Sequence, residues 1–179
     1  MTVTETKLPG CLIIEPKVFN DERGYFFESY NQKKFNDATG LNVNFVQDNQ
    51  SFSTYGVVRG LHYQAGEAAQ AKLVRVITGK VLDVAVDLRK ESATYGQYVA
   101  VELSAENKKQ LFVPRGFAHG FVVLSAEAEF FYKCDNFYSK EFERGILYND
   151  TTLNIDWVLK SSELKASAKD IDLPLFIEL

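Results

Sequence analysis

The chain contains two histidines, and both are candidates for proton-transfer chemistry. His62 lies in the segment RGLHYQ, and His119 lies in GFAHGF. An imidazole with an unperturbed pKa of ~6.5 exchanges protons near neutral pH, so histidine often serves as a general base. Each histidine follows a glycine-containing strand entry, where the mouth of a barrel could lie. The common alternative is a structural histidine that is hydrogen-bonded on a half-apolar strand.

A metal site is not expected at these histidines. A metal-binding jelly roll supplies a His-x-His pair, a carboxylate and a third histidine from adjoining strands. In this chain the corresponding triplet reads His62-Tyr63-Gln64, and the chain has no third histidine to replace the missing one. We therefore expect no iron, manganese or zinc centre.

A base and a cation are predicted to share the interior of one barrel. The two-residue period of a strand places Gln64 on the same face as His62, and Lys72 begins the next predicted strand. The mouth of the barrel would then be polar. Two alternatives remain at this point: Lys72 could be solvated, since lysine is rarely buried without a partner, and Tyr132 could belong to the core.

The elements that must position these residues are short strands. Most of the chain alternates apolar and polar residues between Gly, Pro and Asn/Asp turns, which is typical of an all-β barrel or sandwich. Eight strand-like pieces are VNFVQDN, GVVRGLHYQ, AKLVRVITGK, VLDVAVDLR, QYVAVELS, QLFVP, HGFVVLS and AEFFYKC. Their density favours a jelly roll. Asn31 is predicted to cap a short helix through QKKFNDAT that Gly40 ends.

The segment VLDVAVDL predicts which strand face points inward. Leu82, Val84 and Val86 share one face, whereas Asp83 and Asp87 share the other. We expect the apolar face to be the inner one. After residue 138 the strand pattern weakens, so we predict that the C-terminal region wraps over the barrel. Residues 1–179 would then form a single domain.

Composition limits the possible partners. A hydrophobic fraction of 46% and a charged fraction of 25% are typical of a globular protein. A net charge of −4 argues against broad affinity for nucleic acid or a membrane surface, both of which need a basic face. Cys11 and Cys134 require no disulfide framework. Because the chain has no signal-like start and no long apolar run, we expect a cytoplasmic protein that is neither exported nor membrane-spanning.

Several motifs together carry a resemblance to a known family. The chain contains, in the order seen in dTDP-4-dehydrorhamnose 3,5-epimerases, the segments VQDNQS, GVVRGLHYQ, KLVRV, GKVLDVAVDLR, ELSAENKKQL, VPRGFAHGF, EFFYKC and ERGI. The similarity extends from LPGCLIIEP near the start to the KD pair at 169–170. The resemblance implies a cupin-type jelly roll (double-stranded β-helix), a homodimer, no cofactor, and a role in making dTDP-L-rhamnose for bacterial surface polysaccharides such as O-antigen.

The resemblance also implies a mechanism and four catalytic residues. The substrate would be dTDP-4-dehydro-6-deoxy-D-glucose, whose C4 ketone acidifies the hydrogens on C3 and C5. By motif, His62 matches the base and Asp170 the carboxylate that orients it. Lys72 matches the cation beside the C4 oxygen, and Tyr132 matches the proton donor on the opposite face.

Further positions match ligand-contacting residues of the family. Arg23 and Arg59 match contacts to the diphosphate, which a guanidinium can bind through two parallel hydrogen bonds. Tyr138 matches a residue that stacks on thymine. The other predicted substrate-binding residues are Glu28, Gln47, Asp48, Asn49, His119, Glu143 and Lys169.

Three alternative functions remain open at this point. A relative on the same scaffold could epimerise only C3 or only C5. A metal-dependent cupin would need the missing His-x-His pair. A non-catalytic cupin that binds a sugar nucleotide could keep Arg23, Arg59 and Tyr138, but it would have no need for a base and an acid.

Overall fold

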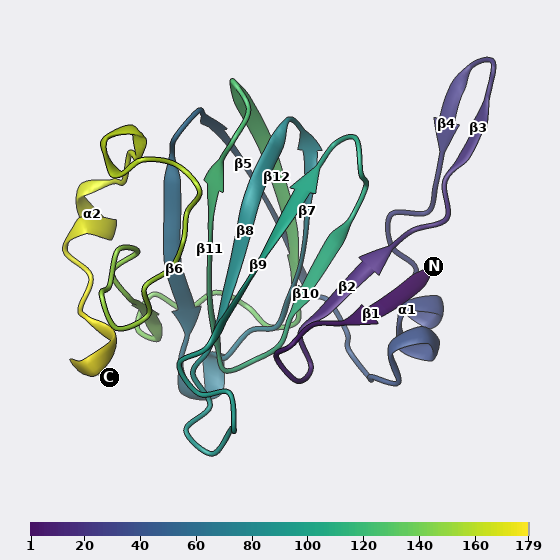
Figure 1. The fold of residues 1–179 in the computed structure, drawn as a ribbon. Coiled ribbons are helices and arrows are strands. Elements are labelled where there is room, and N and C mark those ends of the chain that lie inside the picture. Colours follow the sequence, from purple (N-terminus) through teal and green to yellow (C-terminus); the bar gives the residue numbers. More distant parts are fainter. Residues whose placement is uncertain (179) are drawn as a thin grey trace.

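The computed structural model describes residues 1–178, which form a jelly roll of two antiparallel sheets (Figure 1). The first sheet has the strand order β1-β2-β10-β7-β12-β5, and the second has the order β13-β6-β11-β8-β9. A separate hairpin consists of β3 and β4. The predicted cupin-type jelly roll is thus confirmed.

Strands β5 to β12 follow the eight predicted pieces, whereas β1 to β4 and β13 lie outside them. Their bounds are β1 Thr2–Glu5, β2 Leu12–Glu15, β3 Phe19–Asp21, β4 Gly24–Phe26, β5 Gln47–Thr54, β6 Val58–Gln64, β7 Lys72–Thr78, β8 Lys80–Asp87, β9 Tyr98–Ser104, β10 Gln110–Val113, β11 Phe117–Val123, β12 Glu127–Cys134 and β13 Glu143–Gly145. The helices are α1 Gln32–Thr39 and α2 Ala168–Ile171, with short 3-10 turns at Gly66–Ala68, Ser161–Glu163 and Phe176–Glu178.

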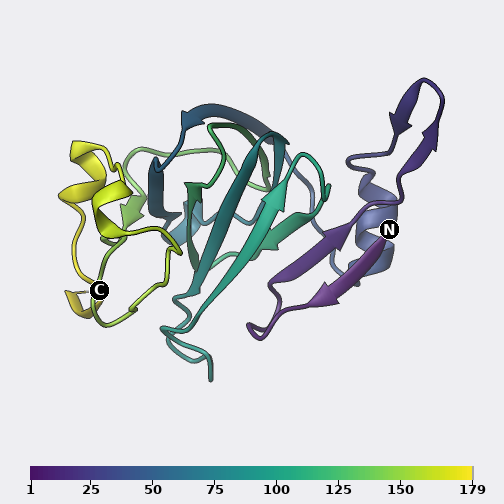
Figure 2. The same cartoon turned by 45° about the horizontal axis from the view of Figure 1, so that its top comes forward.

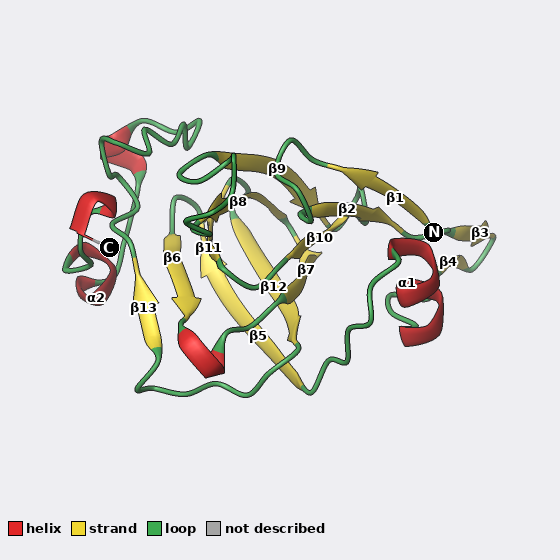
Figure 3. Ribbon diagram, turned by 90° about the horizontal axis from the view of Figure 1, so that it is seen from below, coloured by secondary structure: helices red, strands yellow, loops and turns green. Residues whose placement is uncertain are grey.

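The barrel interior holds the main hydrophobic core. Buried side chains from both sheets meet there, among them Val74, Val81, Leu111, Phe121 and Phe130. The rings of Phe121 and Phe130 stack with their centroids 4.2 Å apart. Seen from below, the strands surround this interior, with α1 and α2 on opposite sides of the molecule (Figure 3). The core fills one part of the barrel and leaves the rest to polar side chains.

The predicted inner face of β8 is wrong. Leu82, Val84 and Val86 point outward and pack against Ile146 and Trp157 of the C-terminal region. The opposite face of the strand, which contributes Val81 and Ala85 to the main core, points inward. The prediction failed because both faces of β8 are buried, and alternation alone does not show which face lies inside.

The C-terminal region wraps over the outer face of the second sheet, as predicted. It starts after β13, which pairs with β6, and near its end Phe176 packs against Tyr95, just before β9. Lys165 forms an isolated parallel bridge with Val57, just before β6. This path brings the short helix α2 to the mouth of the barrel. Among residues 1–178, no helix is long and apolar enough to span a bilayer.

The N-terminal region lies on the other side of the barrel. Strand β2 pairs with β10, and helix α1 packs near it through the buried Phe35. The cap prediction for this helix is confirmed: Asn31 Oδ1 accepts from the backbone N–H of Lys34 at 3.1 Å, and Gly40 adopts φ +71° at the C-cap. The β3–β4 hairpin projects away from the body of the protein in Figures 1 and 2.

Candidate active site

A cavity of about 660 Å³ lies in the barrel mouth, between the strands and the C-terminal region. A second hollow of about 240 Å³ adjoins it. Asn49, His62, Lys72 and Tyr132 line both spaces, so they form one continuous site. The predicted residues around this site are Gln47, Asn49, Arg59, His62, Lys72, His119, Tyr132, Tyr138, Glu143, Lys169 and Asp170.

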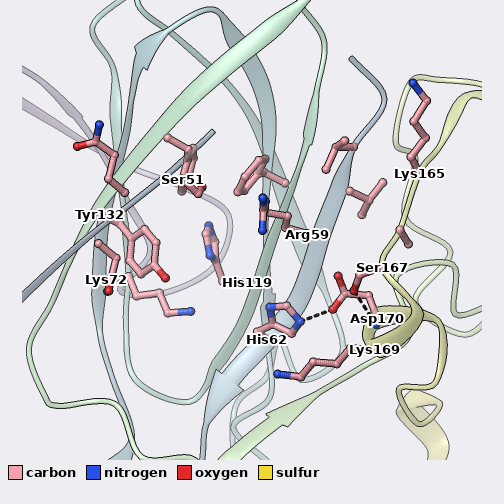
Figure 4. A pocket seen from close by; sticks show the side chains of 17 residues that line it. Ser51, Arg59, His62, Lys72, His119, Tyr132, Lys165, Ser167, Lys169 and Asp170 are labelled. Atoms are coloured by element: carbon pink, nitrogen blue, oxygen red, sulfur yellow. Dashed lines mark hydrogen bonds and ion pairs between the residues drawn. The ribbon is translucent and has the colours of Figure 1, made fainter. Parts of the chain in front are cut away.

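His62 and Asp170 form a hydrogen-bonded pair at one wall of the cavity. His62 Nε2 lies 2.5 Å from Asp170 Oδ1 (Figure 4). Asp170 belongs to α2 and is 4% exposed, and the side chain of Ser167 caps this helix by accepting from the Asp170 N–H. Burial alone would raise the pKa of Asp170, but its bonds to His62, Ser167 and the Gly60 backbone lower it below its ordinary value. A charged carboxylate therefore faces the imidazole.

Close strand packing places the two histidines opposite each other. His62 on β6 and His119 on β11 are direct register partners. Gly60 permits this approach, because a Cβ atom there would lie 2.7 Å from the carbonyl oxygen of His119. Gly60 also has φ +117°, a conformation that other residues rarely adopt. The glycine before His62 is thus required by the backbone geometry of the site.

Lys72 and Tyr132 lie across the cavity from His62 (Figure 4). They come from β7 and β12, and Lys72 Nζ lies 5.8 Å from the centroid of the Tyr132 ring. Burial lowers the pKa of Lys72 and raises the pKa of Tyr132. Within residues 1–178, neither the ammonium nor the phenol group has a hydrogen-bond partner. Both groups are therefore free to bind a ligand atom in the cavity.

His119 is held from behind by a buried carboxylate. Its Nε2 lies 3.0 Å from both oxygens of Asp83, and both residues are buried. Figure 4 shows the ring between Tyr132 and His62. His119 thus lines the cavity, and its contact with a substrate stays a prediction.

A polar network forms the outer part of the site. Glu143 Oε2 accepts from the Tyr138 hydroxyl at 3.0 Å, and Glu143 Oε1 accepts from Lys169 Nζ at 2.7 Å. Gln47 Oε1 accepts from the backbone N–H of Tyr138 at 3.0 Å, and Gln47 Nε2 donates to Asn49 Oδ1 at 3.1 Å. Tyr138 itself is 51% exposed. Hydrogen bonds thus hold the hydroxyl and the backbone of Tyr138, and the face of its ring stays accessible to a flat ligand group.

Arg59 is the guanidinium that the structure places in the cavity. Its Nε donates to Ser53 Oγ at 2.9 Å, and Nη2 donates to the carbonyl of Phe52 at 3.2 Å. These contacts hold the side chain against β5 and leave donors for an anion. Arg59 and Lys169 supply positive charge to a protein whose net charge is −4.

Three predicted ligand-binding residues lie outside the cavity in this chain. Arg23 pairs with Asp21 at the tip of the β3–β4 hairpin. Glu28 bonds to Lys34 near the start of α1. Asp48 pairs with Lys133 at 2.9 Å, on the face of the sheet opposite to that of Asn49.

The structure also adds residues that the sequence reasoning missed. Ser51, Phe121 and Phe130 line the cavity. Each lies two residues from a predicted site residue on the same strand, so the two-residue period could have indicated them. Lys165 and Ser167 come from the irregular C-terminal segment, which offers no periodic signal. Among the described residues, no three His, Cys, Asp or Glu side chains are grouped as metal ligands would be.

Comparisons with known proteins agree on one family. The model of the dTDP-4-dehydrorhamnose 3,5-epimerase family matches residues 5–178. The epimerase of that name from Shigella flexneri is 59% identical over 178 residues, which cover 99% of this chain and 97% of that protein. A crystal structure of this epimerase from Elizabethkingia anophelis NUHP1 is 58% identical and superposes with a TM-score of 0.96, covering 99% of this chain and 97% of that one.

A solved complex among the relatives has a sugar nucleotide bound. It is a dTDP-6-deoxy-D-glucose-3,5-epimerase from Legionella pneumophila Philadelphia 1 in complex with dTDP-4-keto-L-rhamnose. The two chains are 49% identical, with a TM-score of 0.93 and coverage of 97% of this chain and 92% of that one.

Proposed function

The chain belongs to the dTDP-4-dehydrorhamnose 3,5-epimerase family, and we propose how its cavity carries out that reaction. The enzyme inverts C3 and C5 of dTDP-4-dehydro-6-deoxy-D-glucose to give dTDP-4-dehydro-L-rhamnose. The observation that carries the proposal is the His62–Asp170 pair, which faces Tyr132 and Lys72 across one cavity (Figure 4). A base, a proton donor and a cation are thus in one site.

Each inversion starts with proton removal beside the C4 ketone. His62 takes the proton from C3 or C5, and the electron pair moves into an enolate whose negative charge lies on the C4 oxygen. Lys72 stabilises that charge as a fixed cation in a partly buried site, where the interaction is stronger than in water. Tyr132 then returns a proton from the opposite face of the sugar ring. Transfer across the ring inverts the carbon.

Asp170 acts through His62. It accepts from Nε2, which leaves Nδ1 as the nitrogen that faces the reacting carbon. Its negative charge also stabilises the imidazolium that forms when His62 has taken a proton. The low pKa of Asp170 supports this role, because the carboxylate stays ionised at neutral pH.

The outer part of the site suits the nucleotide. Arg59 and Lys169 would bind the diphosphate, whose charge needs local cations. Tyr138 would stack on thymine, with Glu143 holding its hydroxyl. Gln47, Asn49 and His119 would contact the sugar or the base. The side chain of Asp48 points away, so a ligand contact there would use its backbone.

A homodimer would bring Arg23 and Glu28 into the site. The β3–β4 hairpin exposes Phe19, Tyr25 and Phe26 by 53%, 59% and 67%, which is costly for an isolated chain. Strand β5 is a free edge of its sheet, and it lies at the cavity. We infer that the hairpin docks on a second copy and supplies these two side chains there.

We also propose a cytoplasmic enzyme that provides dTDP-L-rhamnose for surface polysaccharides.

The test is the reaction of the purified protein with dTDP-4-dehydro-6-deoxy-D-glucose in D2O. NMR reports the configuration, and mass spectrometry counts the deuterium. Inversion and labelling at both C3 and C5 are expected. Labelling at a single carbon would make the enzyme a mono-epimerase, and a substrate that stays unlabelled would contradict catalysis altogether.

A further inference from the structure

Asp83 is a buried carboxylate next to the active site for which the mechanism above has no role. Its side chain is 0% exposed, and both of its oxygens lie 3.0 Å from His119 Nε2. Among residues 1–178, no other side chain donates a hydrogen bond to it. A buried charge with one hydrogen-bonding partner is costly, so the arrangement needs compensation from nearby positive groups.

The strand register links Asp83 to both histidines. On β8, Asp83 and Ala85 pair with Phe121 and His119 of β11. His119 is in turn the direct partner of His62 on β6. Because Nε2 of His119 is bound to Asp83, Nδ1 is the ring nitrogen left for the cavity. The site therefore contains two histidines, each held through Nε2 by a different carboxylate.

Lys72 is the second group that Asp83 affects. Burial lowers the pKa of Lys72, whereas the charges of Cys134, Asp83 and Glu143 raise it. The thiol of Cys134 is neutral near pH ~7, because burial raises its pKa to about 11. Glu143 is already paired with Lys169 at 2.7 Å. Among the described residues, Asp83 is thus the negative charge near Lys72 that no lysine or arginine pairs with.

The remaining neighbours of Asp83 do not replace this interaction. Cys11 lies on the core side, and burial raises the pKa of its thiol to about 12, so it is uncharged. Asp87, further along the same strand face, is bound by Arg89. The side chains on which Asp83 can act are therefore Lys72 and His119.

Resting on the proposed epimerase function, we propose that Asp83 is a positioning residue that holds the ring of His119 with Nδ1 toward the cavity and supplies a negative charge near Lys72. Asp83 touches no substrate atom in this role. It acts through two side chains that do. The enolate oxygen would then be met by a lysine that is still an ammonium group and by a histidine ring that cannot rotate.

The test compares Asp83→Asn with Asp87→Asn. The second variant is a matched control, because Asp87 is also 0% exposed on β8 but is bound by Arg89 and not by a residue of the cavity. Removing the charge of Asp83 should make Lys72 lose its proton at lower pH. We expect the alkaline limb of kcat/KM to move down by about one pH unit and kcat to fall roughly 10-fold to 100-fold, with little change in KM. Asp87→Asn should leave the pH profile in place. An unmoved alkaline limb in folded Asp83→Asn would overturn the proposal.

A spectroscopic measurement keeps the proposal testable if Asp83→Asn does not fold. The chain has two histidines, so a long-range 1H–15N spectrum of the wild type contains two imidazole patterns, which His62→Gln assigns. His119 should carry its proton on Nε2. A His119 protonated on Nδ1 alone would refute the arrangement. This readout does not depend on turnover, so it separates failure of this inference from failure of the epimerase assignment, which the D2O experiment detects.

Discussion

Nε2 of His62 lies 2.5 Å from Oδ1 of Asp170, although 108 residues separate the two in the chain. The contact exists because the C-terminal region passes over the second sheet and returns α2 to the barrel mouth. The helix has four residues, and its cap by Ser167 fixes where the carboxylate points. The orientation of His62, the proposed base, therefore depends on a segment that has little regular structure of its own.

Asp170→Asn should lower kcat strongly while the fold is kept. The amide cannot stabilise the imidazolium, and it can favour the wrong tautomer of His62, so we expect a loss of about 10³-fold to 10⁴-fold. Steady-state kinetics and circular dichroism of the same sample measure both quantities. Ser167→Ala is the milder companion, because it loosens the helix cap and leaves the carboxylate. A variant Asp170→Asn with near-normal kcat would contradict the role of this pair.

Asp87→Asn should destabilise the protein in a pH-dependent way. Burial raises the pKa of Asp87, but bonds to Arg89, Ser92 and Thr94 outweigh this effect and hold the pKa well below its ordinary value. Because the pKa of Asp87 is lower in the folded than in the unfolded state, its ionised carboxylate stabilises the fold at pH values above the unfolded-state pKa of ~3.9. This stabilisation is lost as the pH falls below that value. We expect a loss of about 3 kcal/mol in the free energy of unfolding at neutral pH.

Denaturant unfolding at several pH values checks this prediction. The difference between wild type and Asp87→Asn should shrink as the solution is acidified below pH ~4. A difference that is independent of pH would show that packing, and not the ionised carboxylate, is what the substitution removes.

Gly60→Ala should damage both stability and activity. The new methyl group would lie 2.7 Å from the His119 carbonyl oxygen, at φ +117°. Gly40→Ala is a suitable control, since Gly40 also has a positive φ (+71°) but no atom within 4 Å of the place that a Cβ would take. The control should cost about 1 kcal/mol in unfolding free energy, whereas Gly60→Ala should cost more and lower kcat. Equal effects of the two variants would mean that the close strand approach is unimportant.

Mixing two inactive variants tests the proposed exchange of the hairpin. If Arg23 serves the site of a second copy, a dimer of one Arg23→Ala subunit and one His62→Ala subunit contains one complete site. Co-refolded variants should then recover up to about a quarter of the wild-type activity, because half of the dimers are mixed and each has one intact site. No recovery, with mixed dimers confirmed by mass spectrometry, would argue against a contribution from the second copy.

The local structure of this chain could be predicted well from its sequence. The helix from Gln32 to Thr39 is capped by Asn31 and Gly40 as expected. Strand β5 begins at Gln47, later than the segment VNFVQDN suggested, because residues 41–46 run as an irregular segment before it. The single domain over residues 1–179 stays a prediction. One cooperative transition in equilibrium unfolding would support it.

The long-range parts of the site could not be derived from patterns. Both faces of β8 are apolar enough to be buried. The alternation of apolar and polar residues along this strand therefore could not predict that Asp83 lies on the inward face. Asp170 lies in a polar segment without periodicity, and only the family resemblance indicated it. The placement of Arg23 away from the cavity is likewise a property of the folded chain.

The most direct test of the central claim separates the base from the acid. His62→Ala and Tyr132→Phe are incubated with dTDP-4-dehydro-6-deoxy-D-glucose in D2O, and labelling and inversion are measured independently. If His62 removes the proton and Tyr132 returns it from the other face, His62→Ala should show neither labelling nor inversion. Tyr132→Phe should still exchange C3 or C5 hydrogen for deuterium with retained configuration. Labelling by His62→Ala at the wild-type rate would contradict the account, because another residue would then be the base.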